Sequence, residues 1–236
     1  MTDKTTVPAH VSIIMDGNGR WATLRGQERI FGHKEGCESV RACTEFAIQK
    51  GIRYLSLFAF SEENWSRPKE EVEGLMQIMI KSIRDETPTF EKNGIRFMAL
   101  GDFSRLSQAL QMEIKECMEL TEHNHTLTLI IFISYSGKWD IIQAVNRIIA
   151  EKGEEGKGLP QIDQNLIDKY LCTAGIPDPD LLIRTSGEER ISNFLLWQTA
   201  YSEYYFTKTL WPDFRKTEFQ NALVAYSKRD RRFGKV

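Results

Sequence analysis

The chain has 236 residues, of which 41% are hydrophobic and 27% are charged, so its composition is that of a globular protein and not of a disordered chain. A formal net charge of -2 excludes the strongly basic surface of a general nucleic-acid binder, and we expect no nucleic-acid partner. Neither a bilayer-spanning apolar run nor a signal-peptide core is visible, which predicts a cytoplasmic protein. The length suits one domain over residues 1–236, with residues 1–9 as a flexible N-terminus.

Strand-like and helix-like segments alternate along the chain. This alternation predicts an α/β fold with a mostly parallel central sheet and helices on both faces. In such sheets the ligand site lies at the carboxyl ends of the strands. The expected strands are 10–16, 53–61, 95–102, 127–134 and one within 177–187. The expected helices are 32–51, 68–86, 105–121, 139–153, 164–172 and 211–227, and the segment 192–206 is expected to contain a helix and a short strand.

The sequence MDGNGRW, residues 15–21, directly follows the first expected strand. Gly17 and Gly19 allow a sharp turn and a close approach of the backbone to a ligand, and consecutive turn amides can bind an anion. Arg20 can fork onto phosphate oxygens, and Asp16 can hold Mg²⁺ together with phosphate and water. A plain surface turn is the alternative, because Asp-Gly and Asn-Gly are frequent turn sequences, and this stretch alone does not decide between the two.

Arginines also follow the ends of other expected strands. Arg29 and His33 come after the first strand, Arg67 after the second, and Arg184 and Arg190 close to the end of the fifth. Each of them alone could be a solvated surface residue, but together, in a chain of balanced charge, they indicate a site for one or two diphosphates. Ser61, Asn64, Trp65 and Ser192 lie in the same segments.

Several common site motifs are missing from the sequence. A G-x-x-x-x-G-K-[ST] loop, a complete G-x-G-x-x-G motif and a G-x-S-x-G elbow are all absent, which argues against a P-loop nucleotidase, a dinucleotide-binding fold and an α/β-hydrolase. His123 and His125 have no third ligand nearby in the sequence and are expected to lie in a loop without metal. The apolar segments 72–80 and 127–134 could wall a tunnel, although their periodicity is explained better by an ordinary core.

Six blocks of the sequence resemble those of the cis-prenyltransferases, and most closely those of the bacterial undecaprenyl diphosphate synthases. They run in the expected order from about His10 to Gly234, nearly the whole chain. The blocks are HVSIIMDGNGRWA, GHKEG, LFAFSEENWSRP, DLLIRTSGEERISNFLLWQTAYSEYYF, LWPDF and RDRRFG.

The resemblance implies a Mg²⁺-dependent transferase that adds isopentenyl diphosphate units to farnesyl diphosphate with cis double bonds. The implied product is a long polyprenyl diphosphate, undecaprenyl diphosphate, which is the precursor of a lipid carrier in cell-wall synthesis. The resemblance also implies an apolar tunnel for the growing chain, a homodimer, and transient contact with the inner membrane for product release. A synthase of shorter chains and a non-catalytic homologue are the rival hypotheses, and the presence of Asp16, Arg190 and Ser192 argues against the second.

The family pattern assigns roles residue by residue. Asp16 is implied to assist Mg²⁺ and the departing diphosphate, and Glu203 to be a second metal-linked acid near the dimer interface. Asn64 is implied to act at the reaction centre, where the proton acceptor stays open between an Asn64 relay, Ser61 and a phosphate oxygen. The implied substrate-binding residues are Gly17, Asn18, Gly19, Arg20, Trp21, Arg29, His33, Ser61, Trp65, Arg67, Arg184, Arg190 and Ser192.

The chain departs from the family pattern after the fourth expected strand. The family usually has Asn-Tyr-Gly-Gly-Arg where this chain has Ser-Tyr-Ser-Gly-Lys at residues 134–138. Lys138 lacks the planar fork of arginine, so we expect no ligand role for it. Phe132 and Ile133 are larger than the small residues often found at these positions. If both side chains face the tunnel, we expect them to shorten the product.

Overall fold

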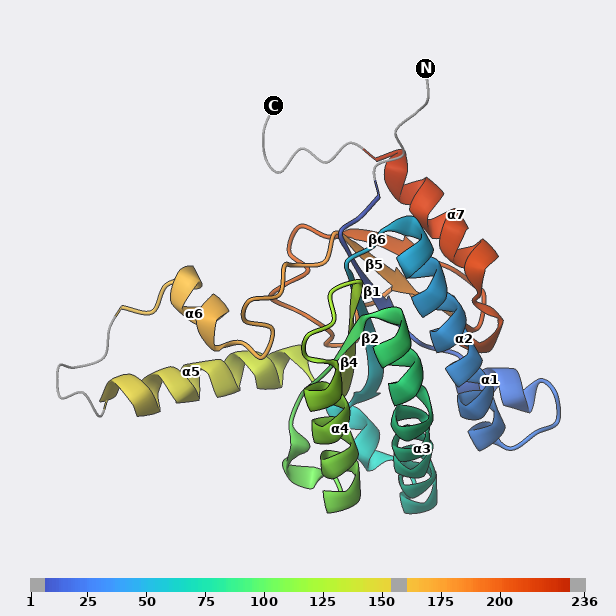
Figure 1. The fold of residues 1–236 in the computed structure, drawn as a ribbon, viewed down its shortest axis with the longest axis horizontal. Helices are drawn as coiled ribbons and strands as arrows, with labels where there is room; N and C mark the ends of the chain where they lie inside the picture. Colours follow the sequence, from blue (N-terminus) through green and yellow to red (C-terminus); the bar gives the residue numbers. More distant parts are fainter. Residues whose placement is uncertain (1–6, 154–160, 230–236) are drawn as a thin grey trace.

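The computed structural model describes residues 7–153 and 161–229 and is built on one six-stranded sheet (Figure 1). Every neighbouring pair of strands is parallel, in the order β3-β4-β2-β1-β5-β6. The α/β class predicted from the sequence is therefore confirmed. The strands are β1 (His10–Ile14), β2 (Tyr54–Ser61), β3 (Ile95–Leu100), β4 (Leu127–Tyr135), β5 (Leu181–Arg184) and β6 (Glu203–Phe206).

The two faces of the sheet are covered differently. One face packs against α2, α3, α4 and α7 and forms the larger core. The other face is covered by the first turn of α5 and by irregular segments near residues 172–176 and 191–195. The rest of α5 projects from the sheet together with α6 (Figure 1). The α-helices are α1 (Asn18–Thr23), α2 (Arg29–Lys50), α3 (Lys69–Asn93), α4 (Gln108–Thr121), α5 (Gly137–Gly153), α6 (Gln164–Tyr170) and α7 (Lys216–Ser227).

The two long helices beside the sheet begin and end where turn residues allow it. α2 ends at Gly51 and α3 at Gly94, both with φ values near +70° that favour glycine. α3 begins after Pro68, as expected, but it continues beyond the predicted end at residue 86. Pro88 lies inside this helix, where it removes one hydrogen bond. Burial of Ile83 and Phe90 on either side keeps the last turns packed on the sheet.

Two predictions for the C-terminal part of the chain are wrong. The segment from residue 192 to 202 forms successive turns and no helix, because Ser192, Asn193 and Leu195 all have positive φ values that interrupt a helix. The last helix does not begin at residue 211. Trp211–Asp213 form a 3-10 turn, η3, and α7 starts only at Lys216, after two residues in extended conformations. The short strand expected in this region is β6.

The N-terminal strand is anchored directly at its start. The backbone N–H groups of Ala9 and His10 donate to the Asp180 carboxylate at 2.8 and 3.1 Å. The predicted flexible segment 1–9 falls partly on residues 1–6, which lie outside the described residues. At its other end Pro8 is buried and Ala9 is hydrogen-bonded, and the flexibility of the segment stays a prediction.

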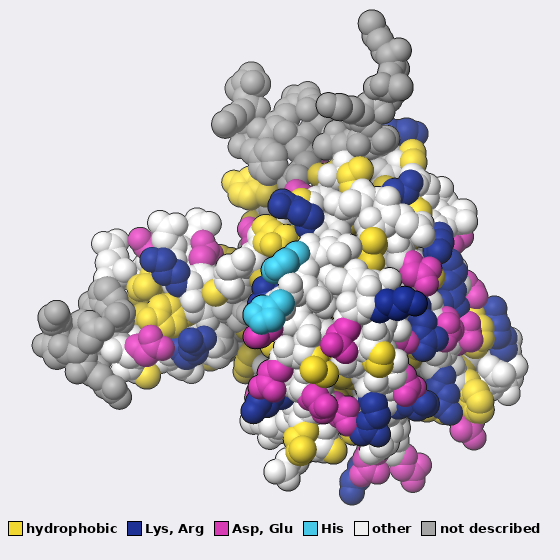
Figure 2. Space-filling model, in the orientation of Figure 1, with side chains coloured by type: hydrophobic (Ala, Val, Ile, Leu, Met, Phe, Trp, Pro, Cys, Tyr) yellow, Lys and Arg dark blue, Asp and Glu magenta, His cyan; other side chains and the backbone are white. Residues whose placement is uncertain are grey.

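Basic and acidic side chains are interspersed over the face that carries α3 and α4 (Figure 2). Many of them form ion pairs within a helix or between neighbouring helices, such as Lys81 with Asp85 and Arg84 with Glu113. This face therefore offers no single-sign patch of the kind that binds a nucleic-acid backbone. Within residues 7–153 and 161–229, none of the helices combines the length and the apolar character needed to cross a bilayer.

Candidate active site

Asp16 and Arg184 meet at the carboxyl ends of the two central strands β1 and β5. Ile14 pairs with Arg184 in the sheet, and Asp16 follows two residues later. Arg184 is only 4% exposed, and its Nη2 donates to Asp16 Oδ2 at 3.0 Å. Its Nη1 donates to Ser192 Oγ at 2.6 Å and to the backbone oxygen of Arg190. A buried guanidinium is thus aimed at the mouth of the sheet, where the sequence predicted a ligand site.

Arg20 approaches the same carboxylate from α1. Its Nη2 lies 3.4 Å from Asp16 Oδ2, and the guanidinium also donates to the backbone oxygen and the hydroxyl of Ser186. Partial burial raises the pKa of Asp16. Hydrogen bonds from Arg184 and Ser186, together with the charges of Arg184 and Arg20, outweigh that effect and hold the pKa below its ordinary value. Asp16 is therefore ionised at neutral pH and lies between two cationic groups.

A second basic group, formed by Arg29 and Arg67, lies beside the first. Both guanidinium groups contact Glu71 of α3 at 3.3 Å. The pKa of Arg67 is lowered, mainly by burial and also by the charge of Arg29. The charges of Glu71 and Asp16 raise this pKa but do not outweigh the burial. Arg29 also lies against Gly19 of α1, the residue before Arg20, so the two basic groups are close to each other. The structure thus brings together arginines that the sequence placed after different strands.

Close packing of α1 on α2 forms the wall between these groups. A Cβ atom on Gly32 would lie 1.9 Å from the backbone oxygen of Asn18, so only glycine fits there. A Cβ atom on Gly19 would lie 2.5 Å from the Arg29 guanidinium, which shows how closely this arginine approaches the α1 backbone. The block GHKEG therefore includes a packing residue of α2, Gly32, as well as a candidate ligand residue, His33.

Three of the candidate residues carry buried polar atoms without a partner in the structure. These atoms are Asn18 Oδ1, His33 Nε2 and Arg184 Nε. Burial lowers the pKa of His33 from 6.5 to about 4, and the charges of Arg67 and Arg29 add to this effect while Glu71 opposes it. His33 is therefore neutral at pH 7 and can donate from one ring nitrogen. Unpaired buried polar atoms are rare in native proteins, and at this site they indicate room for a polar ligand.

Ser61 and Asn64 form a capping box around the 3-10 segment η1 (Glu62–Ser66). The Ser61 N–H donates to Asn64 Oδ1 at 3.2 Å, and the Asn64 N–H donates back to the Ser61 hydroxyl. Trp65 of the same segment packs on Phe60 and lies under the Arg105 guanidinium, 4.4 Å from its ring centroid. All the predicted residues of this segment thus lie at the end of β2, next to Arg67.

Other candidate residues lie outside these groups. Glu203 is the first residue of β6, so it lies roughly 10 Å back along the strand direction from the level of Arg184, and it pairs with Arg229 at 2.6 Å. Within one chain the structure therefore does not bring Glu203 to Asp16. The side chain of Arg190 is exposed and pairs with Glu188, so only its backbone oxygen reaches Arg184. The Trp21 indole donates to Asp213 at 2.7 Å.

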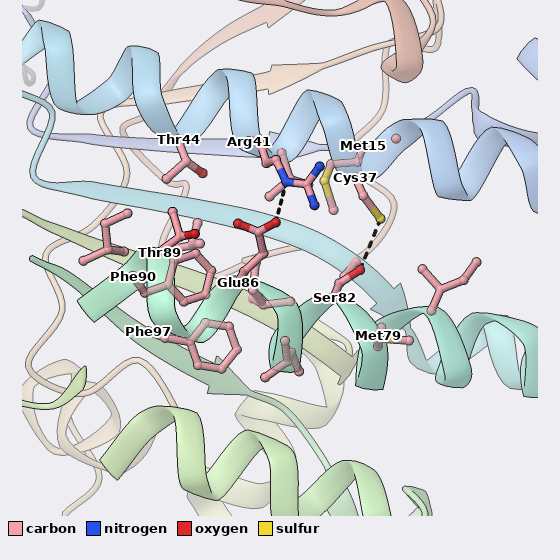
Figure 3. Close-up of a pocket in the computed structure, with 18 of the residues that line it drawn as sticks. Met15, Cys37, Arg41, Thr44, Met79, Ser82, Glu86, Thr89, Phe90 and Phe97 are labelled. Carbon is pink, nitrogen blue, oxygen red and sulfur yellow. Dashed lines mark hydrogen bonds and ion pairs between the residues drawn. The ribbon is translucent and has the colours of Figure 1, made fainter. Parts of the chain in front are cut away.

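An elongated cavity of about 760 Å³ lies between α2, α3 and the sheet (Figure 3). Asn18 and His33 line it at the end near Arg29 and Arg67, and its α2 lining continues as far as Gln49, roughly 24 Å along the helix axis. Leu75 and Met79 of α3 and Leu129, Ile131 and Ile133 of β4 form apolar walls. Leu75, Leu129 and Ile133 also belong to the larger core, so the ordinary-core interpretation holds for them as well. The structure adds that they border a cavity, and occupation of this cavity by a growing chain stays a prediction.

The two bulky residues of β4 lie on opposite faces of the sheet. Ile133 lines the cavity, but Phe132 points to the other face, where its ring packs against Tyr135 and Phe194 at centroid distances of 4.6 and 5.1 Å. The hypothesis that Phe132 narrows the tunnel is therefore wrong. Successive strand residues alternate between faces, so only one of the two could point into the cavity.

The carboxylate at the mouth of the sheet suits a magnesium ion that is bound jointly by the protein and by a phosphate-bearing ligand. In the part of the chain that the structure describes, three or more His, Cys, Asp or Glu side chains nowhere gather as a metal site. Asp16 provides one ionised carboxylate beside the arginines. Mg²⁺ is often held by one or two carboxylates, substrate phosphates and water, so Asp16 and a diphosphate would suffice. His123 is exposed and contacts Glu122 in a loop before β4.

Comparison with known proteins decides the family. A family model described as "Putative undecaprenyl diphosphate synthase" matches residues 14–234. The chain belongs to this prenyltransferase family. The resemblance to cis-prenyltransferases that the sequence blocks indicated is therefore confirmed.

Curated relatives cover nearly the whole chain. An isoprenyl transferase of Chlorobaculum tepidum is 52% identical over 98% of this chain and 87% of the relative. The ditrans,polycis-undecaprenyl-diphosphate synthase ((2E,6E)-farnesyl-diphosphate specific) of Haemophilus influenzae is 48% identical over 98% of this chain and 97% of the relative. The protein of the same name from Escherichia coli (strain K12) is 48% identical over 95% and 89%.

Solved structures share the fold of this family member. Lavandulyl diphosphate synthase from Lavandula x intermedia, in complex with dimethylallyl diphosphate, superposes with a TM-score of 0.93 at 38% identity, covering 97% of this chain and 99% of that one. A "probable undecaprenyl diphosphate synthase" from Campylobacter jejuni superposes with a TM-score of 0.82 at 33% identity, covering 98% and 100%.

Sequence reasoning missed several residues of this prenyltransferase site. Thr185 and Ser186 directly follow Arg184. The Thr185 hydroxyl donates to the backbone oxygen of Asp16, and the Ser186 hydroxyl accepts a hydrogen bond from Arg20. Glu71 connects the second pair of arginines. Trp211 lines the cavity, whereas Trp21 and Trp65, two of the implied substrate-binding residues, are not part of its lining. The position of Trp211 in the block LWPDF was the one signal that could have pointed to it.

Proposed function

We propose that the protein is a Mg²⁺-dependent cis-prenyltransferase that condenses isopentenyl diphosphate units onto farnesyl diphosphate to give undecaprenyl diphosphate. The observation that carries this proposal is the junction of a cationic mouth with an apolar cavity. Asn18 and His33 line that cavity and lie beside Arg29 and Arg67. This arrangement suits an amphiphile with a diphosphate head and a long hydrocarbon tail.

The chain's own residues would stabilise the leaving diphosphate. Departure of diphosphate from an allylic carbon leaves a cation-like centre and a strongly anionic group. Arg20, Arg29, Arg67 and Arg184 present preorganised positive charge to that anion. Asp16 and the diphosphate oxygens would hold Mg²⁺, which supplies further neutralisation of charge when it is bound. The apolar cavity keeps water from the reacting carbon, which protects the cation-like centre.

The proton released from isopentenyl diphosphate needs an acceptor near η1. Asn64 Oδ1 and the Ser61 hydroxyl are already engaged with backbone N–H groups of the same segment. A diphosphate oxygen is therefore the acceptor that requires no rearrangement of η1. A relay through Asn64 or Ser61 would first have to break this capping box.

Two further parts of the proposal concern assembly and location. The arm formed by α5 and α6 exposes Ile142 and Ile149, which lie one heptad apart on the same face of α5, and Ile162 before α6. A second copy of the chain would cover this apolar surface, and Glu203 would take part in a metal site only in such a homodimer. A long polyprenyl product is insoluble in water, so we also propose a cytoplasmic enzyme that contacts the inner membrane transiently to release it.

One incubation tests the proposed reaction. The purified chain is mixed with farnesyl diphosphate, labelled isopentenyl diphosphate and Mg²⁺, and the hydrolysed products are separated by chain length. A ladder that ends at undecaprenyl length supports the proposal, whereas no incorporation of label overturns it. Omission of Mg²⁺ is the control for the metal, and full activity in chelator would overturn the metal requirement.

A synthase of shorter chains is the second candidate, and Ile133 is the observation that favours it. This side chain is buried in the cavity wall next to the carboxyl end of β4, where the growing tail would begin. The product-length experiment separates the two candidates, because a cavity narrowed at this point would end the ladder well before undecaprenyl length.

A further inference from the structure

The η1 segment is tied to the end of β4 by two serine side chains. The Ser136 hydroxyl donates to Glu62 Oε2 at 2.9 Å. The Trp65 indole N–H donates to the Ser134 hydroxyl at 2.9 Å. Both serines are almost fully buried, at 1% exposure, so they form a fixed platform for a more exposed segment.

Ser136 has a second partner that holds its hydroxyl in place. Its Oγ accepts the backbone N–H of Trp139 at 3.2 Å, which caps the start of α5. A serine hydroxyl has one hydrogen to donate, and here that hydrogen goes to the Glu62 carboxylate. A hydrogen bond to a carboxylate is stronger than one between neutral groups. Ser136 therefore connects the rigid start of α5 to the first residue of η1.

Ser134 is oriented by its backbone and by the packing around Trp65. Its φ value is 53°, in the left-handed region that serine rarely occupies. The Trp65 ring packs between the edge of Phe60, at a centroid distance of 5.1 Å, and the Arg105 guanidinium, at 4.4 Å. This packing points the indole N–H at Ser134.

A third side-chain contact comes from the turn that follows β5. Asn193 Nδ2 donates to Glu63 Oε1 at 2.8 Å, and the backbone oxygen of Asn193 accepts the Gly137 N–H at 2.6 Å. Three anchor points, at Glu62, Glu63 and Trp65, therefore lie on either side of Asn64. Two of the three come from Ser134 and Ser136, which stand where the family pattern has asparagine and glycine.

We propose that Ser134 and Ser136 are positioning residues that clamp η1 in its observed position next to the candidate diphosphate site. The clamp rests on the proposed function, because it is through Asn64 and Arg67 that a fixed η1 would act on substrate. By holding η1 in this position, the two hydroxyls tighten the binding of isopentenyl diphosphate and slow the departure of product.

The test replaces both hydroxyls without disturbing the backbone. Glycine accepts the positive φ at residue 134, and at an N-cap position such as 136 it costs only a few tenths of a kcal/mol relative to serine. The variant is therefore S134G/S136G in the full chain. The matched control is Ser107→Gly, because Ser107 also caps a helix, α4, and contacts no residue of η1.

Amide hydrogen exchange of the ligand-free chain measures the clamp directly. We expect exchange in residues 61–67 to rise about tenfold in S134G/S136G and to stay unchanged in S107G. Exchange equal to wild type in the double variant, or an equal rise in S107G, would overturn the clamp. The single variants Ser136→Gly and Glu62→Ala should not add to each other when combined, and full additivity would contradict a direct contact.

Steady-state kinetics separates positioning from general damage. We expect the KM for isopentenyl diphosphate to rise severalfold in S134G/S136G, because the clamped position of η1 is less populated, while kcat is unchanged or higher. A fall in kcat at unchanged KM would overturn the proposed role. If the wild-type chain does not turn over at all, the proposed function fails, and the exchange experiment still decides whether the clamp exists.

Discussion

Asp16 Oδ2 and Arg184 Nη2 lie 3.0 Å apart, although 168 positions separate the two residues along the chain. They meet because β1 and β5 are parallel neighbours and both strands end at the same edge of the sheet. Arg184 is buried there with Asp16 as its carboxylate partner. The pair therefore joins the first strand, the fifth strand and the candidate diphosphate site.

Replacement of Asp16 tests the centre of the proposed mechanism. We expect Asp16→Ala to reduce turnover by about 100- to 1,000-fold, as loss of one preorganised electrostatic group does in other enzymes. The fold should persist, because Arg184 keeps its contacts with Ser192 and the Arg190 backbone. Incorporation of labelled isopentenyl diphosphate and circular dichroism are the two measurements.

A carboxylate outside the site provides the control for this experiment. Asp85 forms a surface ion pair with Lys81, and Asp85→Ala should leave turnover unchanged. Asp16→Asn keeps the shape of the side chain and removes its charge, so it should be nearly as inactive as Asp16→Ala. Turnover of either Asp16 variant within tenfold of wild type would contradict the assignment.

The buried imidazole of His33 predicts how stability depends on pH. Its pKa is about 4 in the folded chain and 6.5 in the unfolded chain. Between these two values the unfolded chain binds a proton that the folded chain does not. The contribution to stability is complete above pH 6.5 and is lost as the pH falls towards 4, at roughly 1.4 kcal/mol for each pH unit. We therefore expect the free energy of unfolding of the wild type to fall in this window.

Denaturant titrations at pH 7.5, 5.5 and 4.5 measure this effect. His33→Gln should show a shallower dependence on pH than the wild type. His10 is also buried with a pKa of about 4, and it lies at the opposite end of β1, so His10→Gln should flatten the same window without changing substrate binding. An unchanged slope in His33→Gln would show that its pKa is not depressed.

The opposite orientations of Ile133 and Phe132 predict different effects of truncation. Ile133→Ala enlarges the cavity wall, and we expect it to lengthen the product by one or more isoprene units if wild-type chain growth stops at this wall. Phe132→Ala should leave product length unchanged and cost about 3–5 kcal/mol of stability, because its ring is buried among aromatic side chains on the other face. Product ladders and denaturant titrations of both variants are compared, and a longer product from Phe132→Ala would contradict the structure.

The apolar arm of α5 predicts the oligomeric state. Ile149 is 45% exposed, and we expect Ile149→Asp to convert a dimer into a folded monomer, because a charge cannot be buried unpaired in an interface. Light scattering coupled to gel filtration gives the mass. Met112→Asp on α4 is the control, since Met112 is also exposed but lies on another part of the surface. A wild-type chain that is monomeric at micromolar concentration would contradict the homodimer.

Local patterns were sufficient for much of the fold. The apolar run 10–14 and the helical spacing of 32–51 were interpreted correctly, because their periodicity and their end signals agree. The prediction failed in 192–202, where Ser192, Asn193 and Leu195 have positive φ values and where two side chains bond outside the segment, Ser192 with Arg184 and Asn193 with Glu63. It also failed for the start of α7, where Pro212 marks a 3-10 turn and not the helix itself.

The candidate site, like the fold, could be predicted only in part from the sequence. The residue types in MDGNGRW and the arginines after several strands indicated anion chemistry before any contact was known. Their grouping could not be read from the chain, and neither could the position of Glu203 at the far edge of the sheet, because strand order is set by long-range packing. In β4 the apolar residues alternate between two buried faces, so the pattern could not show that Ile133, and not Phe132, lines the cavity.

The amino-acid sequence by itself determined the α/β class, the family and the kinds of side chain at the mouth, since these depend on local periodicity and on which residues are present. Only the tertiary structure decided that Asp16 is paired with Arg184, that a cavity runs between α2 and α3, and that Ser134 and Ser136 hold η1. Each of these contacts joins residues far apart in the chain. Their formation depends on how whole strands and helices pack, which no local pattern encodes.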